Sequence, residues 1–307
     1  MHRLIIAAAA LASVTTAQAA PPDLGGLWTS GSLTPLERPK DFKALTISEP
    51  EARAYEARRR NQPPPIEDDV GGADSEWWET DEPLQRVRGQ PRTSLIVSPA
   101  DGKLPFTAAA AARNKDRTAR RKLTTDNPED RGRGDRCLPG ALAGPPMING
   151  VYNNNFRIVQ TRDHLVIQAE YLGDVRIVRL DPRARRGPPH VRRWLGESIG
   201  HWEGDTLVIV TTNFTATEVD APDGDPAADA VVIERLTRLG PDRLGYAFTV
   251  RNPSLYVMPW QGEMELRTTA GPLFEVACHE GNYALRSMLA GSRQAEAQAP
   301  AQDGSKP

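Results

Sequence analysis

The stretch GHWEGD holds the first pair of side chains that could exchange protons with a ligand. If it is a strand, alternate side chains share a face, so His201 and Glu203 lie together and could act as acid and base near a barrel mouth. The structural alternative, which we favour, is that Trp202 enters the core opposite Leu207 while His201 and Glu203 stay in solvent beside a hairpin.

A second candidate acid is Glu170, which precedes Asp174 and Arg176 across a tight turn at Gly173. A carboxyl group whose pKa is raised inside an apolar barrel could serve as a general acid. An ion pair between facing strands is the commoner reason for a glutamate and an arginine in such positions. We therefore favour the ion pair over the catalytic role.

Four polar residues in a row, Tyr152, Asn153, Asn154 and Asn155, form a third candidate. Amides donate and accept hydrogen bonds, so this run could line a ligand opening or stabilise an oxyanion. Asparagine also forms turns in which its side chain bonds the local backbone. The turn is the interpretation that the composition favours.

The stretch FEVACHEGNYAL places Cys278 beside His279, with Glu275 three residues before the cysteine. In a regular strand neighbouring side chains point to opposite faces, which argues against a catalytic Cys–His dyad. In an oxidising compartment Cys278 would instead pair with Cys137, the other cysteine of the chain. His279, with Glu275 on the same face, keeps a claim to chemistry.

The sequence predicts no metal and no cofactor. The histidines after the N-terminal segment show no H-x-H or H-E-x-x-H spacing, and the cysteines show no C-x-x-C. A metal site assembled in space from His201, His279 and a carboxylate stays open. Lys and Arg number 38 against 40 Asp and Glu, so the overall charge predicts neither a nucleic-acid partner nor an anionic-membrane partner.

Residues 1–19 have the form of a cleaved secretory signal: a basic start, a short apolar run and a small-residue cleavage pattern. The apolar run is too short to span a bilayer. We therefore expect a mature chain that starts near Ala20, is periplasmic or secreted, and does not insert into a membrane.

The elements that must position these residues differ between the two halves of the mature chain. Residues 20–150 predict an irregular wrapping region with a possible first strand at 26–30, a helix from Ser48 to about Arg60 with a Ser48–Glu51 capping box, and a second helix capped by Thr107. Residues 151–291 predict the β core and a short C-terminal helix capped by Asn282, and residues 292–307 a disordered tail.

The second half predicts an antiparallel meander, because short apolar runs alternate with turn residues. The expected strands are 156–161, 164–171, 174–180, 199–203, 206–212, 230–239, 243–251, 262–269 and 273–279. A flat sheet of this size would leave long exposed edges, so closure into a mainly β, calycin-like or lipocalin-like barrel is the economical solution.

The tripeptide Gly26-Leu27-Trp28 resembles the G-x-W that opens the first strand of lipocalins, where the tryptophan plugs one barrel end. The six tryptophans, Trp202 and Trp260 among them, are many for a chain with 6% aromatic residues. Indoles that line a cavity would favour an apolar or aromatic ligand. Alternatively, several of them cover the barrel ends.

Three longer stretches, GPPMINGVYNNNFRIVQT, RRWLGESIGHWEGDTLVIVTTNF and FEVACHEGNYALRSMLAG, carry a family resemblance. The chain resembles a large, uncharacterised family of exported bacterial proteins found in proteobacteria and acidobacteria. The resemblance covers most of the mature chain and implies export, a β-rich body and both cysteines at matching places. It transfers no catalytic residue.

Two functions of different class follow. In the first, the barrel takes an apolar or aromatic small molecule into its cavity and acts on it by cofactor-independent lyase, isomerase or hydrolase chemistry, with His201, Glu203, His279 or Glu170 as acid and base. In the second, the protein binds or carries the molecule without catalysis. The first hypothesis, an enzyme, predicts that His201, His279 and the asparagines 153–155 converge in one pocket.

Overall fold

The fold comes from a computed structural model that describes residues 20–61, 79, 81–123, 127–128, 136–138, 144–215, 229–276 and 283–298. Within these residues nine strands close into a barrel in the order β1-β5-β6-β7-β8-β9-β10-β11-β12, because β12 pairs back onto β1. The strands are β1 (Gly26–Thr29), β5 (Asn155–Gln160), β6 (His164–Ala169), β7 (Val175–Arg179), β8 (Glu197–Glu203), β9 (Thr206–Thr212), β10 (Val231–Arg238), β11 (Arg243–Arg251) and β12 (Trp260–Thr268). The predicted barrel is thus confirmed.

One pairing departs from an antiparallel meander. β8 lies parallel to β7 and pairs with it only at Val178↔Ser198 and Arg179↔Ile199. The cause is the connection between them, residues 180–196, which carries the chain back along the barrel before β8 begins. The other neighbouring strands of the barrel pair antiparallel over four to eight residues, except at the β12–β1 closure, which has two residue pairs. The barrel wall therefore has two short pairings, β7–β8 and β12–β1.

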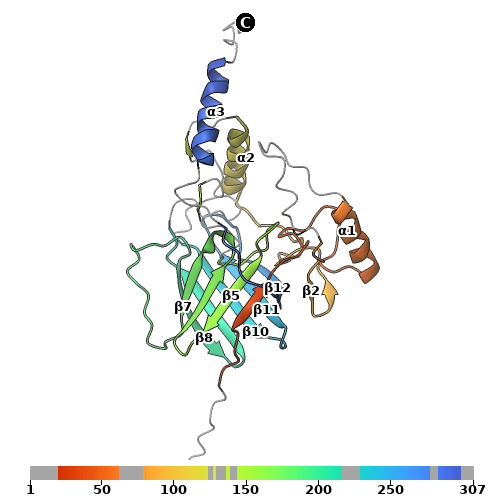
Figure 1. The fold of residues 1–307 in the computed structure, drawn as a ribbon, viewed down its shortest axis with the longest axis vertical. Coiled ribbons are helices and arrows are strands. Elements are labelled where there is room, and N and C mark those ends of the chain that lie inside the picture. Colours follow the sequence, from red (N-terminus) through yellow and green to blue (C-terminus); the bar gives the residue numbers. More distant parts are fainter. Residues whose placement is uncertain are drawn as a thin grey trace, which may run out of the picture.

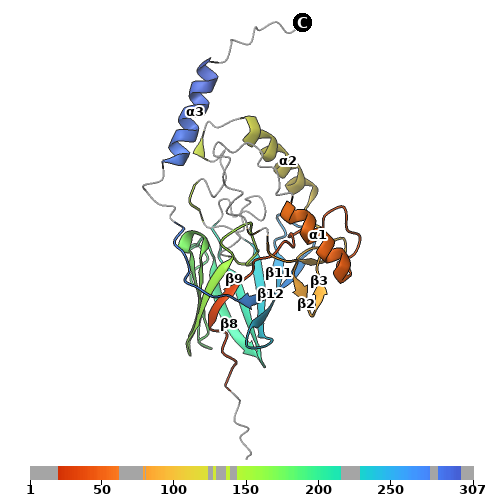
Figure 2. The ribbon, with the colours of Figure 1, turned by 45° about the vertical axis from the view of Figure 1, so that its right-hand side comes forward.

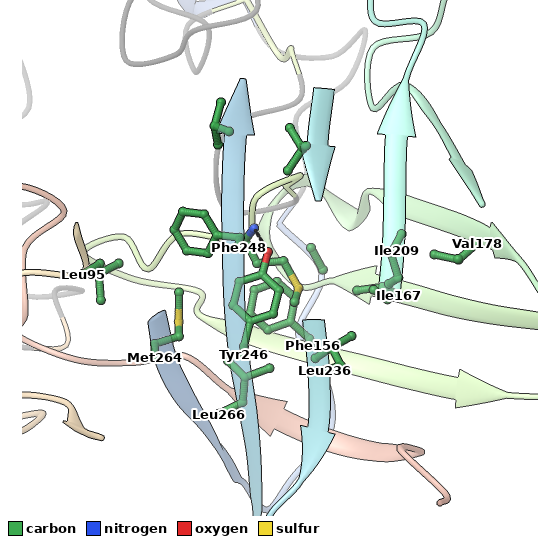
Figure 3. Close-up of a cluster of buried hydrophobic side chains, with 14 of the residues drawn as sticks. Leu95, Phe156, Ile167, Val178, Ile209, Leu236, Tyr246, Phe248, Met264 and Leu266 are labelled. Atoms are coloured by element: carbon green, nitrogen blue, oxygen red, sulfur yellow. Dashed lines mark hydrogen bonds between the residues drawn. The ribbon is translucent and has the colours of Figure 1, made fainter. Parts of the chain in front are cut away.

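The barrel interior is filled by inward-facing side chains of alternating residues. In β11, Leu244, Tyr246, Phe248 and Val250 are buried, as the alternation of RLGYAFTV predicts. Figure 3 shows side chains from several strands, among them Phe156, Ile209 and Leu266, converging around Tyr246. Packing of this kind places the apolar core inside the barrel itself.

Trp28, the tryptophan of the lipocalin-like G-x-W, is part of the buried core. The indole is fully buried, and its Nε1 donates a hydrogen bond to the Leu24 carbonyl at 3.1 Å. The guanidinium of Arg238, at the end of β10, lies 4.9 Å from the centre of the indole ring. Gly26 has φ +145°, and a Cβ there would lie 3.1 Å from the Trp28 Nε1, which explains the glycine.

The strand expected at 273–279 is wrong for its described part, because residues 273–276 form no strand. The edge of β12 that it would need is taken by β1 and by β4 (Ile96–Ser98). Pro272 also lacks an N–H for a ladder hydrogen bond. The wrapping region, residues 20–150, supplies two strands of this sheet, β1 and β4, where the sequence predicted at most one.

The helices lie outside the barrel wall. Figures 1 and 2 show α2 (Ala108–Leu123) and α3 (Ala284–Gln298) beyond one end of the barrel, and α1 (Glu49–Asn61) on its flank beside the hairpin β2 (Arg86–Val87) and β3 (Gln90–Pro91). Ser48 and Glu51 form the predicted capping box of α1, with Glu51 accepting from the Ser48 N–H at 2.9 Å. The α3 helix continues past residue 291 to Gln298, so the disordered tail predicted from 292 is wrong over its first seven residues. None of the described helices is both long and apolar enough to cross a membrane.

Candidate functional site

His201 and Glu203 lie on the outer surface of the barrel. Their side chains are 58% and 48% exposed, and the imidazole Nε2 lies 3.1 Å from the Glu203 Oε1. Arg235 donates to the other oxygen of Glu203 at 2.8 Å, and the hydrogen bonds from Arg235 and His201 hold the pKa of Glu203 below its usual range. Trp202 points the other way and packs against the core, paired with Leu207. This is the solvent-facing arrangement that the sequence favoured over a catalytic pair.

The asparagines lie toward the opposite end of the barrel. β7 begins directly after the turn that follows Glu170, and β8 runs parallel to β7. His201 stands near the far end of β8, whereas Asn155 contacts Glu170. The expected convergence of His201 with the asparagines is therefore wrong. His279, the third member of that expected pocket, lies outside the described residues.

The structure does gather the other predicted polar residues into one cluster. The Asn155 Nδ2 donates to the Glu170 Oε2 at 2.7 Å, and the Phe274 N–H donates to the Glu170 Oε1 at 2.9 Å. The ring of Tyr152 lies 6.1 Å from that of Tyr171. Glu170 is buried, and each of its carboxylate oxygens accepts a hydrogen bond, as a buried carboxylate requires.

Asn154 and Asn153 contribute to this cluster in different ways. Asn154 is fully buried, and its amide bridges the Gly150 backbone and a carboxylate, Glu79, to which its Nδ2 donates at 2.8 Å. Asn153 has φ +54°, a left-handed conformation that asparagine tolerates in turns. The turn interpretation thus holds for Asn153, while Asn154 and Asn155 hold carboxylates.

Glu79 is a residue that the sequence analysis missed. Burial raises its pKa above the usual range, hydrogen bonds from Asn154 partly offset this, and the negative charges of Glu82 and Glu170 raise it further. Glu79 stands in an acidic run that offers no spacing cue, so only the tertiary contact with Asn154 identifies it. The cluster of Glu79, Asn154, Asn155 and Glu170 could hold or transfer a proton.

Arg176 does not pair with Glu170 or Asp174 but crosses the barrel interior to Glu234 on β10. Its Nη1 and Nη2 donate to the two oxygens of Glu234 at 2.6 and 2.9 Å, and both side chains are at most 2% exposed. Burial alone would lower the pKa of Arg176, yet the charge and hydrogen bonds of Glu234 raise it overall. The predicted ion pair exists, but with a partner from a distant strand.

Tyr246 completes this buried network. Its hydroxyl donates to the Glu234 Oε1 at 2.7 Å and accepts from the Met147 N–H at 2.9 Å. Burial, followed by the negative charge of Glu234, raises the pKa of Tyr246 well above its usual range. The phenol therefore stays neutral and acts as a donor to the carboxylate.

A pocket of about 360 Å³ opens where β7 and β8 separate, and we call it the β7–β8 pocket. Its volume lies in the range of small-molecule sites. It is lined by His164, Val175, Arg176, Ile177, Arg179, Arg193, Leu195, Gly196, Glu197 and Ser198. Val175 and Ile177 face outward from β7 and are 49% and 57% exposed, so they offer apolar surface to a ligand.

Glu197 organises the charged side of the β7–β8 pocket. It accepts hydrogen bonds from Arg179 at 2.5 Å, from the Gly187 N–H at 2.9 Å and from Asn213 at 2.9 Å. Burial would raise its pKa, but these hydrogen bonds and the neighbouring positive charges hold the pKa below its usual range. Glu197 is therefore ionised and holds Arg179, Gly187 and Asn213 together at the pocket wall.

The remaining predicted site residues lie apart from this pocket. Trp260 is 2% exposed and makes edge contacts with Phe248 and Tyr256, so it belongs to the core. Glu275 is exposed, one residue beyond the Phe274 that contacts Glu170. Cys278 lies outside the described residues, so its pairing with Cys137 stays a prediction.

Over the described part of the chain, no group of three or more His, Cys, Asp or Glu side chains could hold a metal ion. No protein-family model, curated protein or solved structure matches the chain. The resemblance to the exported bacterial family therefore stays a prediction from the sequence.

Proposed function

We propose that this protein binds an apolar or aromatic small molecule in the β7–β8 pocket. The observation that carries the proposal is the pocket itself, because it combines about 360 Å³ of volume with an exposed apolar wall of Val175 and Ile177. Core side chains fill the inward positions of the barrel, and this favours a ligand site in the wall over one in the interior. A ligand is better accommodated in the wall than in the centre.

A fluorescent apolar probe, N-phenyl-1-naphthylamine, tests this function. We expect it to bind the folded chain and to bind about tenfold more weakly to Ile177→Asp, because about 1.4 kcal/mol of apolar contact corresponds to that factor. The matched control is Val159→Asp, since Val159 is likewise on the outer face, 47% exposed and outside the pocket lining. Equal binding by both variants and the unchanged chain would exclude the pocket as the site.

A second candidate function is cofactor-independent acid–base catalysis, supported by the raised pKa of Glu79 beside Asn154 and Glu170. In this scheme Glu79 or Glu170 serves as the acid, and His201 and Glu203 take no part because they face solvent. A screen of lyase, isomerase and hydrolase substrates tests it. Turnover that is lost in Glu170→Gln and Glu79→Gln but kept in Glu203→Gln would support catalysis, and turnover insensitive to all three would contradict it.

We further propose that the protein acts in the periplasm or outside the cell after cleavage near Ala20, with a disulfide between Cys137 and Cys278. The N-terminal pattern of residues 1–19 and the two cysteines of the chain support this proposal.

A further inference from the structure

We infer that the molecule bound in the β7–β8 pocket is an organic anion, whose carboxylate or sulfonate contacts Arg193 and whose apolar body lies against Val175 and Ile177. The inference rests on the proposed function and narrows it to a class of ligand. It depends on the charges around the pocket rather than on its volume.

The pocket lining carries an excess of positive charge. The lining includes three arginines, Arg176, Arg179 and Arg193, and one carboxylate residue, Glu197. His164 adds an imidazole that becomes positive on protonation. Arg176 and Arg179 are engaged, because they pair with Glu234 and Glu197 respectively.

Arg193 differs from the other two arginines. It is exposed, and within the described residues its guanidinium has no hydrogen bond or ion pair. Guanidinium groups bind carboxylates and other oxyanions through charge-assisted, often bidentate hydrogen bonds. Arg193 is therefore the group in the lining that is available for an anionic ligand.

The connection that carries Arg193 is fixed against the barrel, so the backbone at Arg193 is held beside the pocket. The Arg193 N–H donates to the Asn213 carbonyl at 3.0 Å, and the Gly187 N–H donates to Glu197. Arg186 reaches the carbonyls of Glu197 and Val210 at 3.0 and 3.1 Å. Because this backbone is already ordered, only the Arg193 side chain loses conformational freedom when an anion binds.

The same connection carries a large excess of positive charge. Residues 180–196 include five arginines and one histidine against a single acidic residue, Asp181. Their summed field attracts an anion toward the pocket. Because charge and apolar wall adjoin, the pocket suits a molecule that carries both an acidic group and an apolar body.

Two probes that share one aromatic body separate the anion from the apolar contact. 8-Anilinonaphthalene-1-sulfonate carries a sulfonate, and N-phenyl-1-naphthylamine lacks it. We expect the sulfonate to bind more tightly to the full chain, and Arg193→Gln to weaken its binding about tenfold while changing the neutral probe less than about twofold. Added salt should weaken the sulfonate alone, because screening acts on the charge.

The control variant is Arg251→Gln, since Arg251 is an exposed arginine at the end of β11 outside the pocket lining. It should leave both probes unchanged, and near-ultraviolet circular dichroism should show that each variant is folded. Equal affinity for both probes, with no effect of Arg193→Gln, would overturn the anion class. If Ile177→Asp still weakened binding of the neutral probe, the proposed function would stand without the anion inference. If neither Ile177→Asp nor Arg193→Gln changed the binding of either probe, the proposed function and the anion inference would both be rejected.

Discussion

The buried ion pair between Arg176 and Glu234 gives the sharpest prediction about stability. Replacing Glu234 by Gln removes the negative charge while keeping the shape and an acceptor for the Tyr246 hydroxyl. It leaves the Arg176 guanidinium, 2% exposed, without a counter-charge in the core. Breaking a buried pair on one side costs about 3–5 kcal/mol, so we expect Glu234→Gln to lower the free energy of unfolding by that amount.

The outer surface of the same barrel supplies a matched control. Glu203 also pairs with an arginine, Arg235, at 2.8 Å, but its side chain is 48% exposed. Solvent screens such a pair, so the free energy of unfolding of Glu203→Gln should not differ measurably from that of the unchanged chain. The contrast between the two substitutions isolates the effect of burial, because the chemical change is the same.

Removing both buried charges should recover stability that each single change loses. Arg176→Met alone leaves Glu234 buried and unpaired, whereas the double variant leaves neither charge. Urea unfolding followed by tryptophan fluorescence and by circular dichroism measures the four free energies, and coincident transitions confirm two-state behaviour. A coupling energy below about 1 kcal/mol, or a loss on Glu234→Gln no larger than that on Glu203→Gln, would refute the argument.

Two further predictions concern Glu79 and the cysteines. The pKa of Glu79 is raised in the folded chain, so its contribution to stability is present at low pH and is lost as pH rises above 4.5 through the folded pKa. Urea midpoints from pH 4 to pH 8 should therefore fall in the unchanged chain relative to Glu79→Gln, and the opposite trend would contradict the burial of this carboxyl. The mass of the protein from a periplasmic fraction should correspond to a start near Ala20. For the cysteines, iodoacetamide in urea should add no mass to this protein until a reductant is present. Two alkylated thiols without reductant would exclude the bridge.

The strands of the barrel could be predicted from the sequence because their signals are local. The alternation of RLGYAFTV gives β11 with its buried face, and the turn at Gly204 and Asp205 gives the β8–β9 hairpin. The helix beginning at Glu49 follows from its capping box. In each case the residues that determine the element lie within a few positions of one another.

The parallel pairing of β7 and β8 could not be predicted in this way. It depends on where the connection of residues 180–196 returns the chain, and no local pattern encodes that path. The strand expected at 273–279 failed for a related reason, since β1 and β4 had already taken the edge of β12. Competition for an edge is decided by the whole sheet.

The candidate site was predictable as a set of residues but not as a set of contacts. The sequence selected Asn155 and Glu170, which do contact each other, and it selected Arg176, whose partner Glu234 lies 58 residues away. It assigned the basic run RARRGPPHVRR no function, because acidic residues elsewhere balance the overall charge. Only the fold shows that Arg193 from this run lines a pocket.

The buried ion pair starts from β7, the strand that pairs with β8 over only two residues. β7 and β8 share two residue pairs, so backbone hydrogen bonds contribute little to joining these two strands, whereas β7 pairs with β6 over five residues. Arg176 spans the interior from β7 to Glu234 on β10 and passes the two intervening strands, β8 and β9. The pair therefore fastens β7 to the far wall while its outer face is left free to line the pocket. A longer register at this seam would bring β7 and β8 together and remove the separation in which the pocket lies.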